Sequence, residues 1–241
     1  MSQIENKSID LIITDLPFCK THCSWDVAVP LGKLWDGYNR IIKDNAVVAL
    51  FGQQPFTSML VMSNLPLFRY ELIWEKDKPS NFAQANRQPM CYHENILIFY
   101  KKQPIYNKQL VGREGMGVWR YNYDINHQNR TEQGTKIKYP GKREKSNYDV
   151  KFKNPKSILY YNTGRRQELV HPTQKPTSIY EWIILTYTNE GAVCLDSCCG
   201  SGTIGIAAVN TKRQFIGFDN GIDDRTGRSW VEIAEKRLAE L

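Results

Sequence analysis

The stretch VCLDSCCGSGTIG, residues 193–205, decides the fold. Its apolar opening predicts a short strand over 192–196 that is buried on both faces. The glycines that follow allow a tight loop, and the apolar run after them predicts a helix over 202–211. A second strand is expected over 214–219. A strand, a glycine-rich loop and a helix in this order expose free backbone N–H groups, which suit a cofactor that contains a nucleoside.

Strands and helices alternate through most of the remaining chain. Toward the N-terminus, the apolar run 9–14 ends at a turn with a proline and predicts a parallel strand. Apolar residues recur at helical spacing over 31–42, and a short turn leads into a strand over 46–51. The other expected elements are a helix over 56–64, strands over 68–74 and 95–100, and helices over 177–188 and 230–241. This alternation predicts an α/β fold with a doubly wound, mostly parallel sheet.

The segment 101–166 interrupts the alternation and carries most of the positive charge. It holds 16 Lys and Arg against 5 Asp and Glu, a net of +11, and the remainder holds 16 against 20, a net of −4, which together give the +7 of the chain. Aromatic side chains lie among the basic ones, as is typical of nucleic-acid binding, and a solvated surface loop is the alternative. We therefore divide the chain into two halves of one domain, 1–100 and 167–241, with an irregular basic insertion at 101–166.

The six cysteines indicate a reducing compartment. They occupy positions 19, 23, 91, 194, 198 and 199 and lack the CxxC spacing that is usual for metal-binding pairs. Small residues that fill tight turns are therefore favoured over a zinc or iron–sulfur site. No apolar run approaches the length of a membrane span, and no secretory leader precedes the first strand. We expect a cytoplasmic protein with reduced thiols, without a metal and without a membrane partner.

The tetrapeptide Asp15-Leu16-Pro17-Phe18, which ends the first strand, can act on an exocyclic amino group. The lone pair of such a nitrogen is delocalised into its aromatic ring, so acceptors on both protons are needed to localise it. The Asp15 carboxylate supplies one acceptor and the backbone carbonyl of Leu16 the second. Phe18 offers an apolar face that can stack on the ring. An ordinary strand-ending turn is the alternative for the tetrapeptide taken alone.

Three segments of the chain resemble those of the permuted, beta-class amino-group DNA methyltransferases. They are the tetrapeptide 15–18, the glycine-rich stretch 193–205 and His171-Pro172-Thr173-Gln174-Lys175-Pro176. In that family the catalytic tetrapeptide comes first, a target-recognition region follows and the S-adenosylmethionine loop comes last. The resemblance covers roughly residues 9–240 and implies a Rossmann-like, circularly permuted fold. It implies catalysis by Asp15, Leu16, Pro17 and Phe18. It places S-adenosylmethionine against His171, Thr173, Lys175, Asp196, Cys198, Gly200, Ser201, Gly202, Thr203 and Asp219.

The implied reaction is direct, in-line transfer of a methyl group to an amino nitrogen of a base flipped out of double-stranded DNA. An acid at the first tetrapeptide position favours adenine N6, and cytosine N4 is the runner-up. Leu16 and Phe18 stand where the family usually has proline and tyrosine, so a catalytically inactive DNA-binding relative is an alternative of another class. Site-specific methylation within a restriction–modification system and a homodimer are further implications of the resemblance.

A nicotinamide-dependent oxidoreductase is a rival reading of the glycine loop. The segment 200–205 also matches G-x-G-x-x-G, with Asp219 about twenty residues further on. Three features oppose it. Asp196 would repel a pyrophosphate, although it can meet the cationic aminoacyl end of S-adenosylmethionine. Only about forty residues follow the motif, and the segment 171–176 has no role in this reading.

Three positions outside these motifs, and one departure from the family, complete the sequence-based expectations. The resemblance implies an acid such as Glu94 at the entrance to the base pocket, although a strand-start cap fits equally well. Trp74-Glu75-Lys76 and Asn81-Phe82 fit either a DNA cleft or an exposed charged loop. The family's usual first strand carries a Gly-Asp pair that Met1 to Ser8 lacks. We therefore expect weaker cofactor binding than in a complete relative.

Overall fold

The computed structural model describes residues 1–17, 29–112, 152–163, 170, 174–223 and 226–241. It divides into two units, of which the first comprises Met1–Asn107 and Lys156–Leu241 and the second Lys108–Pro155. The second unit falls inside the expected insertion. Its described strands, β5 (Val111–Gly112) and β6 (Phe152–Lys153), pair antiparallel.

A seven-stranded sheet forms the centre of the first unit, in the order β7-β3-β4-β2-β1-β8-β9. Its strands are β1 (Ile9–Thr14), β2 (Ile42–Gly52), β3 (Phe68–Glu75), β4 (His93–Phe99), β7 (Ile158–Tyr160), β8 (Val193–Asp196) and β9 (Gln214–Gly217). Neighbouring strands are parallel except where β4 pairs with β2 and with β3. The predicted α/β fold with a mostly parallel sheet is confirmed.

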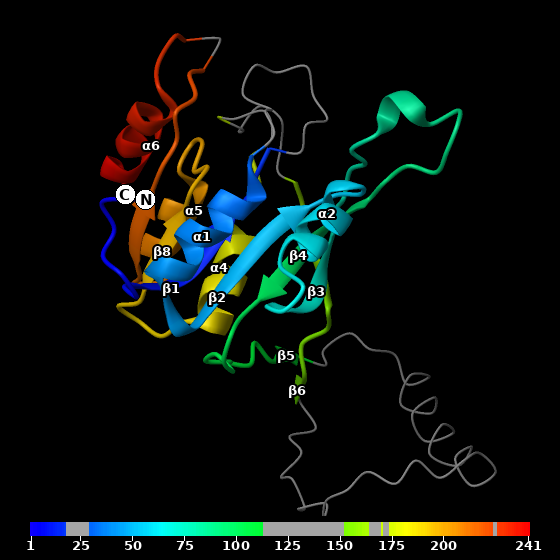
Figure 1. Ribbon diagram of the computed structural model, residues 1–241. Coiled ribbons are helices and arrows are strands. Elements are labelled where there is room, and N and C mark those ends of the chain that lie inside the picture. Colours follow the sequence, from blue (N-terminus) through cyan, green and yellow to red (C-terminus); the bar gives the residue numbers. More distant parts are fainter. Residues whose placement is uncertain (18–28, 113–151, 164–169, 171–173, 224–225) are drawn as a thin grey trace, which may run out of the picture. The chain divides into compact units, whose positions relative to one another are not determined.

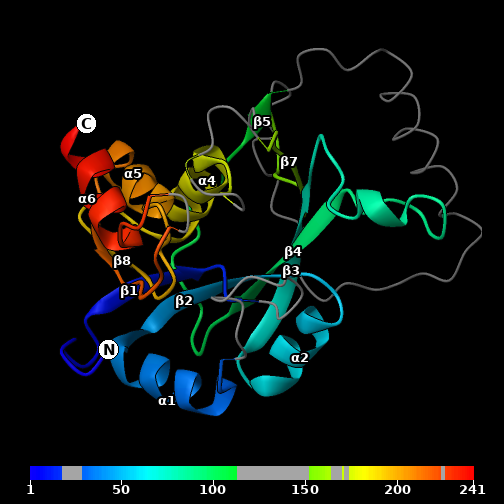
Figure 2. The same cartoon turned by 90° about the horizontal axis from the view of Figure 1, so that it is seen from above.

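Helices cover both faces of this sheet (Figures 1 and 2). One face carries α1 (Leu31–Ile41) and α2 (Phe56–Ser63), and the other carries α4 (Thr177–Tyr187) and α5 (Thr203–Asn210), with α6 (Trp230–Ala239) packed beside α5.

The position of β1 inside the sheet explains why its sequence is almost continuously apolar. Successive side chains of a strand point to opposite faces of the sheet. Ile12 therefore packs in the hydrophobic cluster with α1 and α2, whereas Leu11 and Ile13 pack in the cluster with α4 and α5. All three side chains are fully buried. A strand covered on both faces has no position left for a solvated side chain, as the run 9–14 predicted.

The reversed direction of β4 decides which residues share an edge of the sheet. The first residues of β4 lie at the same edge as the last residues of β1, β3 and β8, because β4 runs against its neighbours. Trp74 near the end of β3 pairs with Glu94 near the start of β4. This carboxyl edge therefore collects the segments that follow β1, β3 and β8 together with the segment that precedes β4.

Several element boundaries differ from the predictions by a few residues. The strand predicted at 46–51 begins at Ile42, because this residue already adopts an extended backbone (φ −76°, ψ 145°) directly after α1. The closing helix ends at Ala239. Within the expected insertion, β7 joins the main sheet alongside β3. None of the helices in the described residues has the length and apolar character needed to cross a bilayer.

Gly202 should be the most sensitive glycine of the fold. Its φ of +77° is strained for any other residue, and a Cβ atom there would lie 2.7 Å from the Cβ atom of Ala234 in α6. Gly191 has a similar φ of +79°, but a Cβ atom there would meet nothing within 4 Å.

We expect Gly202→Ala to lower the free energy of unfolding by about 3 kcal/mol and Gly191→Ala by about 1 kcal/mol. The difference between the two variants reports the contact with Ala234, since the backbone strain is common to both. Urea denaturation without cofactor measures both values. Equal losses would show that the loop does not depend on this contact.

Candidate active site

The segments that follow β1 and β8 lie side by side at the carboxyl edge of the sheet. The two strands are parallel neighbours, with Leu11 paired to Cys194. The backbone N–H of Ser197 donates to Oγ1 of Thr14 at 3.3 Å, although 183 positions separate the two residues. The hydroxyl of Tyr38 in α1 lies 2.6 Å from Oγ of Ser197. The tetrapeptide and the glycine loop thus begin from one small region.

The glycine loop is tied to the turn after β9 by a carboxylate. Oδ2 of Asp219 accepts a hydrogen bond from the backbone N–H of Gly200 at 2.8 Å. Its Oδ1 accepts from the N–H of Gly221 at 2.7 Å. Gly200 and Gly202 have φ angles of +47° and +77°, which favour glycine, and α5 begins at Thr203 directly after them. The loop therefore places the N-terminal end of α5 between Asp196, which ends β8, and Asp219, which follows β9.

Asp196, the last residue of β8, is a buried acid. Its side chain is 3% exposed, and its Oδ1 accepts from the backbone N–H of Cys198 at 2.9 Å. Burial raises the pKa of Asp196 to about 7, against the opposing effect of the Cys198 hydrogen bond. A cationic group bound here would stabilise the carboxylate form. Asp196 thus fits the aminoacyl end of S-adenosylmethionine.

A second buried group of charges surrounds Asp15. The ammonium of Lys175, which precedes α4, contacts Oδ2 of Asp15 and lies 3.2 Å from Oε2 of Glu94. Oε1 of Glu94 lies 2.9 Å from Nζ of Lys76, the first residue after β3. We call Asp15, Lys175, Glu94 and Lys76 the charge cluster. Two ammonium groups and two carboxylates alternate in it.

Burial and attraction compete in the charge cluster. Burial raises the pKa of Asp15, and the nearby Lys175 counters only part of this effect. Burial would also raise the pKa of Glu94, but Lys175 and Lys76 together hold it below its ordinary value. For Lys175, the attraction of Asp15 and Glu94 outweighs burial and raises the pKa of the ammonium. The cluster therefore keeps Lys175 charged beside Asp15.

Aromatic rings form the apolar wall of the charge cluster. Nζ of Lys175 lies 4.8 Å from the centre of the Phe51 ring and 6.0 Å from that of Trp74. Nζ of Lys76 lies 5.6 Å from the Trp74 ring centre. Cations over ring faces are held by the ring quadrupole, most strongly where water is excluded. Phe51 and Trp74 are both buried.

The residues expected at the site fall into four groups, of which the structure describes three. Phe18, His171 and Thr173 lie outside the described residues. Leu16 is buried in the cluster with α1 and α2, next to Asp15 in the charge cluster, and Pro17 is partly buried. The cofactor residues of the glycine loop and Asp219 lie together, as described above. Lys175 was expected against the cofactor, and its ammonium contacts Asp15 and Glu94.

Gln174 was not among the expected site residues, although it lies within the quoted segment 171–176. Its Oε1 accepts from Oγ of Ser201 at 3.2 Å and from the backbone N–H of Val170 at 3.2 Å. The side chain thus joins this segment to the glycine loop. Lys76 was expected in a DNA cleft or an exposed loop and not beside the catalytic acid. It is buried and paired with Glu94.

The thiols of the glycine loop are protonated at neutral pH. Burial raises the pKa of Cys198 and of Cys199 to about 12, helped by the carboxylates of Asp196 and Asp219. A neutral thiol is a poor nucleophile and a poor metal ligand. Cys19 and Cys23 lie outside the described residues, and within the described ones no three His, Cys, Asp or Glu side chains gather as a metal site.

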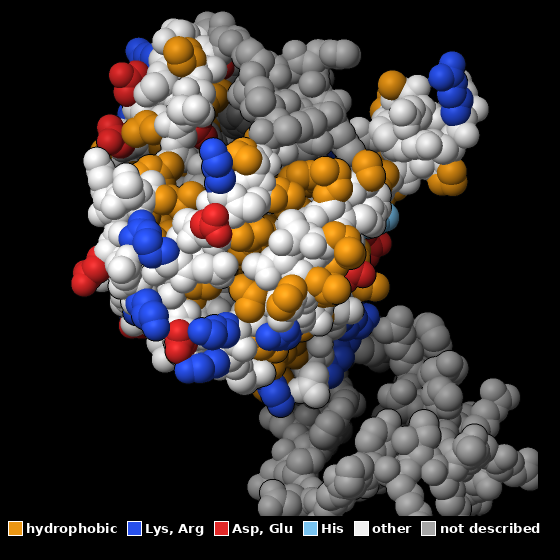
Figure 3. Space-filling model, viewed as in Figure 1, with side chains coloured by type: hydrophobic (Ala, Val, Ile, Leu, Met, Phe, Trp, Pro, Cys, Tyr) orange, Lys and Arg blue, Asp and Glu red, His pale blue; other side chains and the backbone are white. Residues whose placement is uncertain are grey.

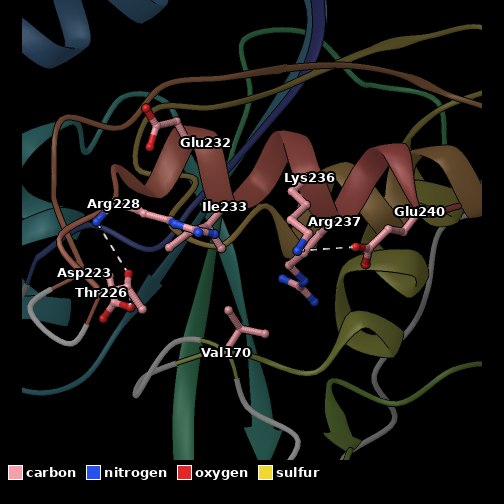
Figure 4. Close-up of a pocket in the computed structure, with 9 residues that line it drawn as sticks. All are labelled: Val170, Asp223, Thr226, Arg228, Glu232, Ile233, Lys236, Arg237 and Glu240. Atoms are coloured by element: carbon pink, nitrogen blue, oxygen red, sulfur yellow. Dashed lines mark hydrogen bonds and ion pairs between the residues drawn. The ribbon is translucent and has the colours of Figure 1, made fainter.

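A pocket of about 450 Å³ lies along α6 (Figure 4). Cationic and acidic side chains line it, together with a few uncharged ones. The lining residues are Val170, Asp223, Thr226, Arg228, Glu232, Ile233, Lys236, Arg237 and Glu240. Arg237 donates to the backbone carbonyl of Ser201 at 2.5 Å, so one wall of the pocket supports the glycine loop from outside.

Comparison with known proteins identifies the family. Residues 9–223 match the family model N6_N4_Mtase, described as DNA methylase. The chain belongs to this DNA methylase family. The match begins at the first residue of β1 and includes both the tetrapeptide and the glycine loop, which agrees with the resemblance seen in the sequence.

Some curated relatives resemble the methylase along most of its length, and others over one shorter segment. The Type II methyltransferase M.HpaI of Haemophilus parainfluenzae is 25% identical, over 99% of this chain and 70% of that protein. M1.MboII of Moraxella bovis is 26% identical, over 91% of this chain and 87% of that protein. M2.DpnII of Streptococcus pneumoniae is 46% identical, but over only 28% of this chain and 23% of that protein.

Solved structures share the fold of the methylase. The M1.HpyAVI–SAM complex superposes with a TM-score of 0.62 at 21% identity, covering 98% of this chain and 90% of that one. The cytosine-N4-specific PvuII DNA methyltransferase superposes with a TM-score of 0.59 at 13% identity, covering 99% and 88%. With the family match, these likenesses support S-adenosylmethionine as the cofactor of the methylase.

Cofactor affinity should follow the ionisation of Asp196. With a pKa of about 7, this carboxyl is mostly neutral at pH 6 and mostly ionised at pH 7.5. We expect S-adenosylmethionine to bind about fivefold more tightly at pH 7.5 than at pH 6, because only the carboxylate attracts the cationic aminoacyl end.

Asp196→Asn should weaken binding about tenfold at pH 7.5 and abolish the pH dependence. Isothermal titration over this pH range measures both effects. A variant that retained the pH dependence of the parent chain would assign the effect to another group.

Proposed function

We propose that this methylase transfers the methyl group of S-adenosylmethionine to N6 of adenine within a specific sequence of double-stranded DNA. The observation that carries the proposal is the Asp15 carboxylate, held by Lys175 at the edge of the sheet where the glycine loop also begins. Methylation of an amino nitrogen needs an acceptor for the amine and a site for the methyl donor next to each other. The parallel pairing of β1 with β8 provides that proximity.

The residues of the chain activate the amine by hydrogen bonding. The Asp15 carboxylate accepts one N–H of the target, and the backbone carbonyl of Leu16 accepts the other, which localises the nitrogen lone pair. When bound, S-adenosylmethionine supplies an electrophilic methyl group, whose bond to sulfur breaks as the bond to nitrogen forms. The nitrogen then carries the positive charge and loses a proton, for which Asp15 is the nearest base. The neutral thiols of Cys198 and Cys199 take no part.

Adenine is favoured over cytosine by the acid at position 15. A carboxylate is a stronger acceptor than the serine hydroxyl that the family mostly uses with cytosine N4. Phe18, outside the described residues, is proposed to stack on the flipped base. A homodimer and a cytoplasmic location are proposals that rest on the resemblance and the bacterial relatives.

Access to DNA is proposed to involve the arm, which we define as residues 76–92 between β3 and β4. Its base is fixed by backbone hydrogen bonds from Lys76 N–H to Tyr92 O at 2.7 Å and from Ser80 N–H to Cys91 O at 3.0 Å. Side-chain contacts add to these, since Nε2 of Gln53 donates to Oγ of Ser80 at 2.9 Å. The arm projects from the sheet edge, as Figure 1 shows.

The tip of the arm combines an exposed aromatic ring with basic side chains. Phe82 is 77% exposed, and Lys78 and Arg87 are exposed as well. In the space-filling view, the arm stands clear of the sheet and carries hydrophobic and basic side chains (Figure 3). An aromatic ring with nearby cations suits stacking on bases and contact with phosphates. The arm begins at Lys76, which belongs to the charge cluster, so its base lies beside the proposed catalytic residues.

Replacement of Asp15 by Asn should lower the single-turnover rate of methyl transfer about a thousandfold, because the amine loses its charged acceptor and its base. Asp36→Asn, at an exposed position of α1, is the matched control and should leave the rate unchanged. The assay uses radiolabelled S-adenosylmethionine, unmethylated DNA and nucleoside analysis of the product. Label on adenine N6 supports the proposal, and label on cytosine N4 replaces it. DNA binding without any transfer would identify an inactive relative.

Phe82→Ala should weaken binding to duplex DNA about tenfold and Phe82→Trp should retain it, because stacking tolerates any large ring. Fluorescence of 2-aminopurine at the target position reports base flipping in the same complexes. Met62→Ala, at a side chain that is 71% exposed on α2, controls for the loss of apolar surface. Unchanged affinity in Phe82→Ala would remove the arm from the DNA interface.

A further inference from the structure

The charge cluster links four segments that are distant in sequence. Lys76 follows β3, Glu94 lies near the start of β4, Lys175 precedes α4 and Asp15 follows β1. The order of contacts is Lys76 to Glu94 at 2.9 Å, Glu94 to Lys175 at 3.2 Å, and Lys175 to Asp15. Side-chain exposure is 4% for Lys76, 14% for Glu94 and 6% for Lys175. Only Asp15, at one end, is placed to meet a target amine.

The two oxygens of Asp15 differ in their surroundings. Oδ2 accepts from Nζ of Lys175, whereas Oδ1 is buried and has no hydrogen-bond partner among the described residues. A buried carboxylate oxygen without a donor is costly, so it commonly marks a position that a ligand completes. Lys175 therefore determines which oxygen of Asp15 is left without a donor among the described residues.

Lys175 is itself held by Glu94, and Glu94 by Lys76. Glu94 repels the Asp15 carboxylate, so it opposes ionisation of Asp15. Lys76 neutralises Glu94 and attracts Asp15, so it favours ionisation. The two residues thus act on Asp15 with opposite signs, although neither forms a hydrogen bond with the described residues of the tetrapeptide.

We propose that Glu94 and Lys76 are positioning residues that set the ionisation of Asp15 with opposite signs, while Lys175 between them holds Oδ2 and leaves Oδ1 for the target amine. The proposal rests on the role of Asp15 in the proposed function. Lys175 holds Oδ2, Glu94 pairs with Lys175, and Lys76 balances the charge of Glu94. The cluster as a whole is neutral while Asp15 is ionised, so its two ammonium groups offset part of the cost that burial imposes on the Asp15 carboxylate.

Replacement of Glu94 or Lys76 leaves the other charged and titratable side chains around Asp15 in place. The further charged or titratable groups that are electrostatically coupled to it are Asp196 at the end of β8, Cys198 in the glycine loop and Tyr180 in α4. Burial raises the pKa values of Cys198 and Tyr180, so both are neutral in the working range. Asp196 titrates near pH 7, and its contribution is common to every variant compared.

Three variants separate a positioning role from a structural one. Lys76→Met removes a cation, so the acid limb of the single-turnover pH profile should move up by about one pH unit. Glu94→Gln removes the competing carboxylate, so the limb should move down by a similar amount, about one unit. The double variant Lys76→Met with Glu94→Gln removes one charge of each sign, and its limb should return close to that of the parent chain.

A second measurement keeps the test independent of methyl transfer. The ¹³C chemical shift of the Asp15 carboxyl reports its titration in the unliganded protein. The midpoint of this titration should move up in Lys76→Met and down in Glu94→Gln, as the acid limb does. Lys212→Met and Glu190→Gln are matched controls, because their ion pair of 3.4 Å is exposed on the surface. Thermal unfolding confirms that each variant is folded.

The proposal is supported if the Asp15 titration moves in opposite directions in the two single variants and returns close to that of the parent chain in the double variant. Shifts in the same direction, or an unchanged Asp15 titration in folded variants, overturn it. An Asp15 titration that shifts as expected in a chain that methylates no DNA would overturn the proposed function and leave the electrostatic inference intact.

Discussion

The parallel pairing of β1 with β8 is the constraint on which the site depends. Parallel strands end at the same edge of a sheet, so the acid that follows β1 and the acid that ends β8 emerge as neighbours. Asp15 and Asp196 belong to segments that are far apart in the sequence, yet the register of Leu11 with Cys194 aligns them. A displaced register would move every side chain of β1 to the wrong face and separate the two acids.

The reversed strand β4 adds a second set of groups to this edge. Its antiparallel direction brings Glu94, near the start of a strand, to the edge where other strands end. The turn between β3 and β4 is the arm, so the same connection that could reach DNA also contributes Lys76 and Glu94 to the charge cluster. One hairpin thus carries both the segment proposed to reach DNA and two members of the charge cluster around Asp15.

The charge cluster is better explained by chemistry than by stability. Buried ion pairs lose hydration that their attraction only partly restores, and apolar side chains of similar volume often serve stability as well or better. Here two ammonium groups and two carboxylates lie against Phe51 and Trp74, and Oδ1 of Asp15 lacks a donor among the described residues. Such an arrangement offsets part of the cost of burying a carboxylate and leaves one of its oxygens without a donor.

Local sequence was sufficient to predict the α/β alternation, the strand–loop–helix order around Gly200 and the tetrapeptide after β1. These features depend on apolar periodicity and on backbone conformations that glycine favours, both of which are written in neighbouring residues. The placement of Lys175 on Asp15, and the part played by Glu94 and Lys76, could not be read in this way. They follow from the direction of β4 and from strand order, which bring together residues separated by up to 160 positions. The sequence by itself determined which groups are available, and tertiary structure alone decided which of them share a buried site, because charges interact through space and not along the chain.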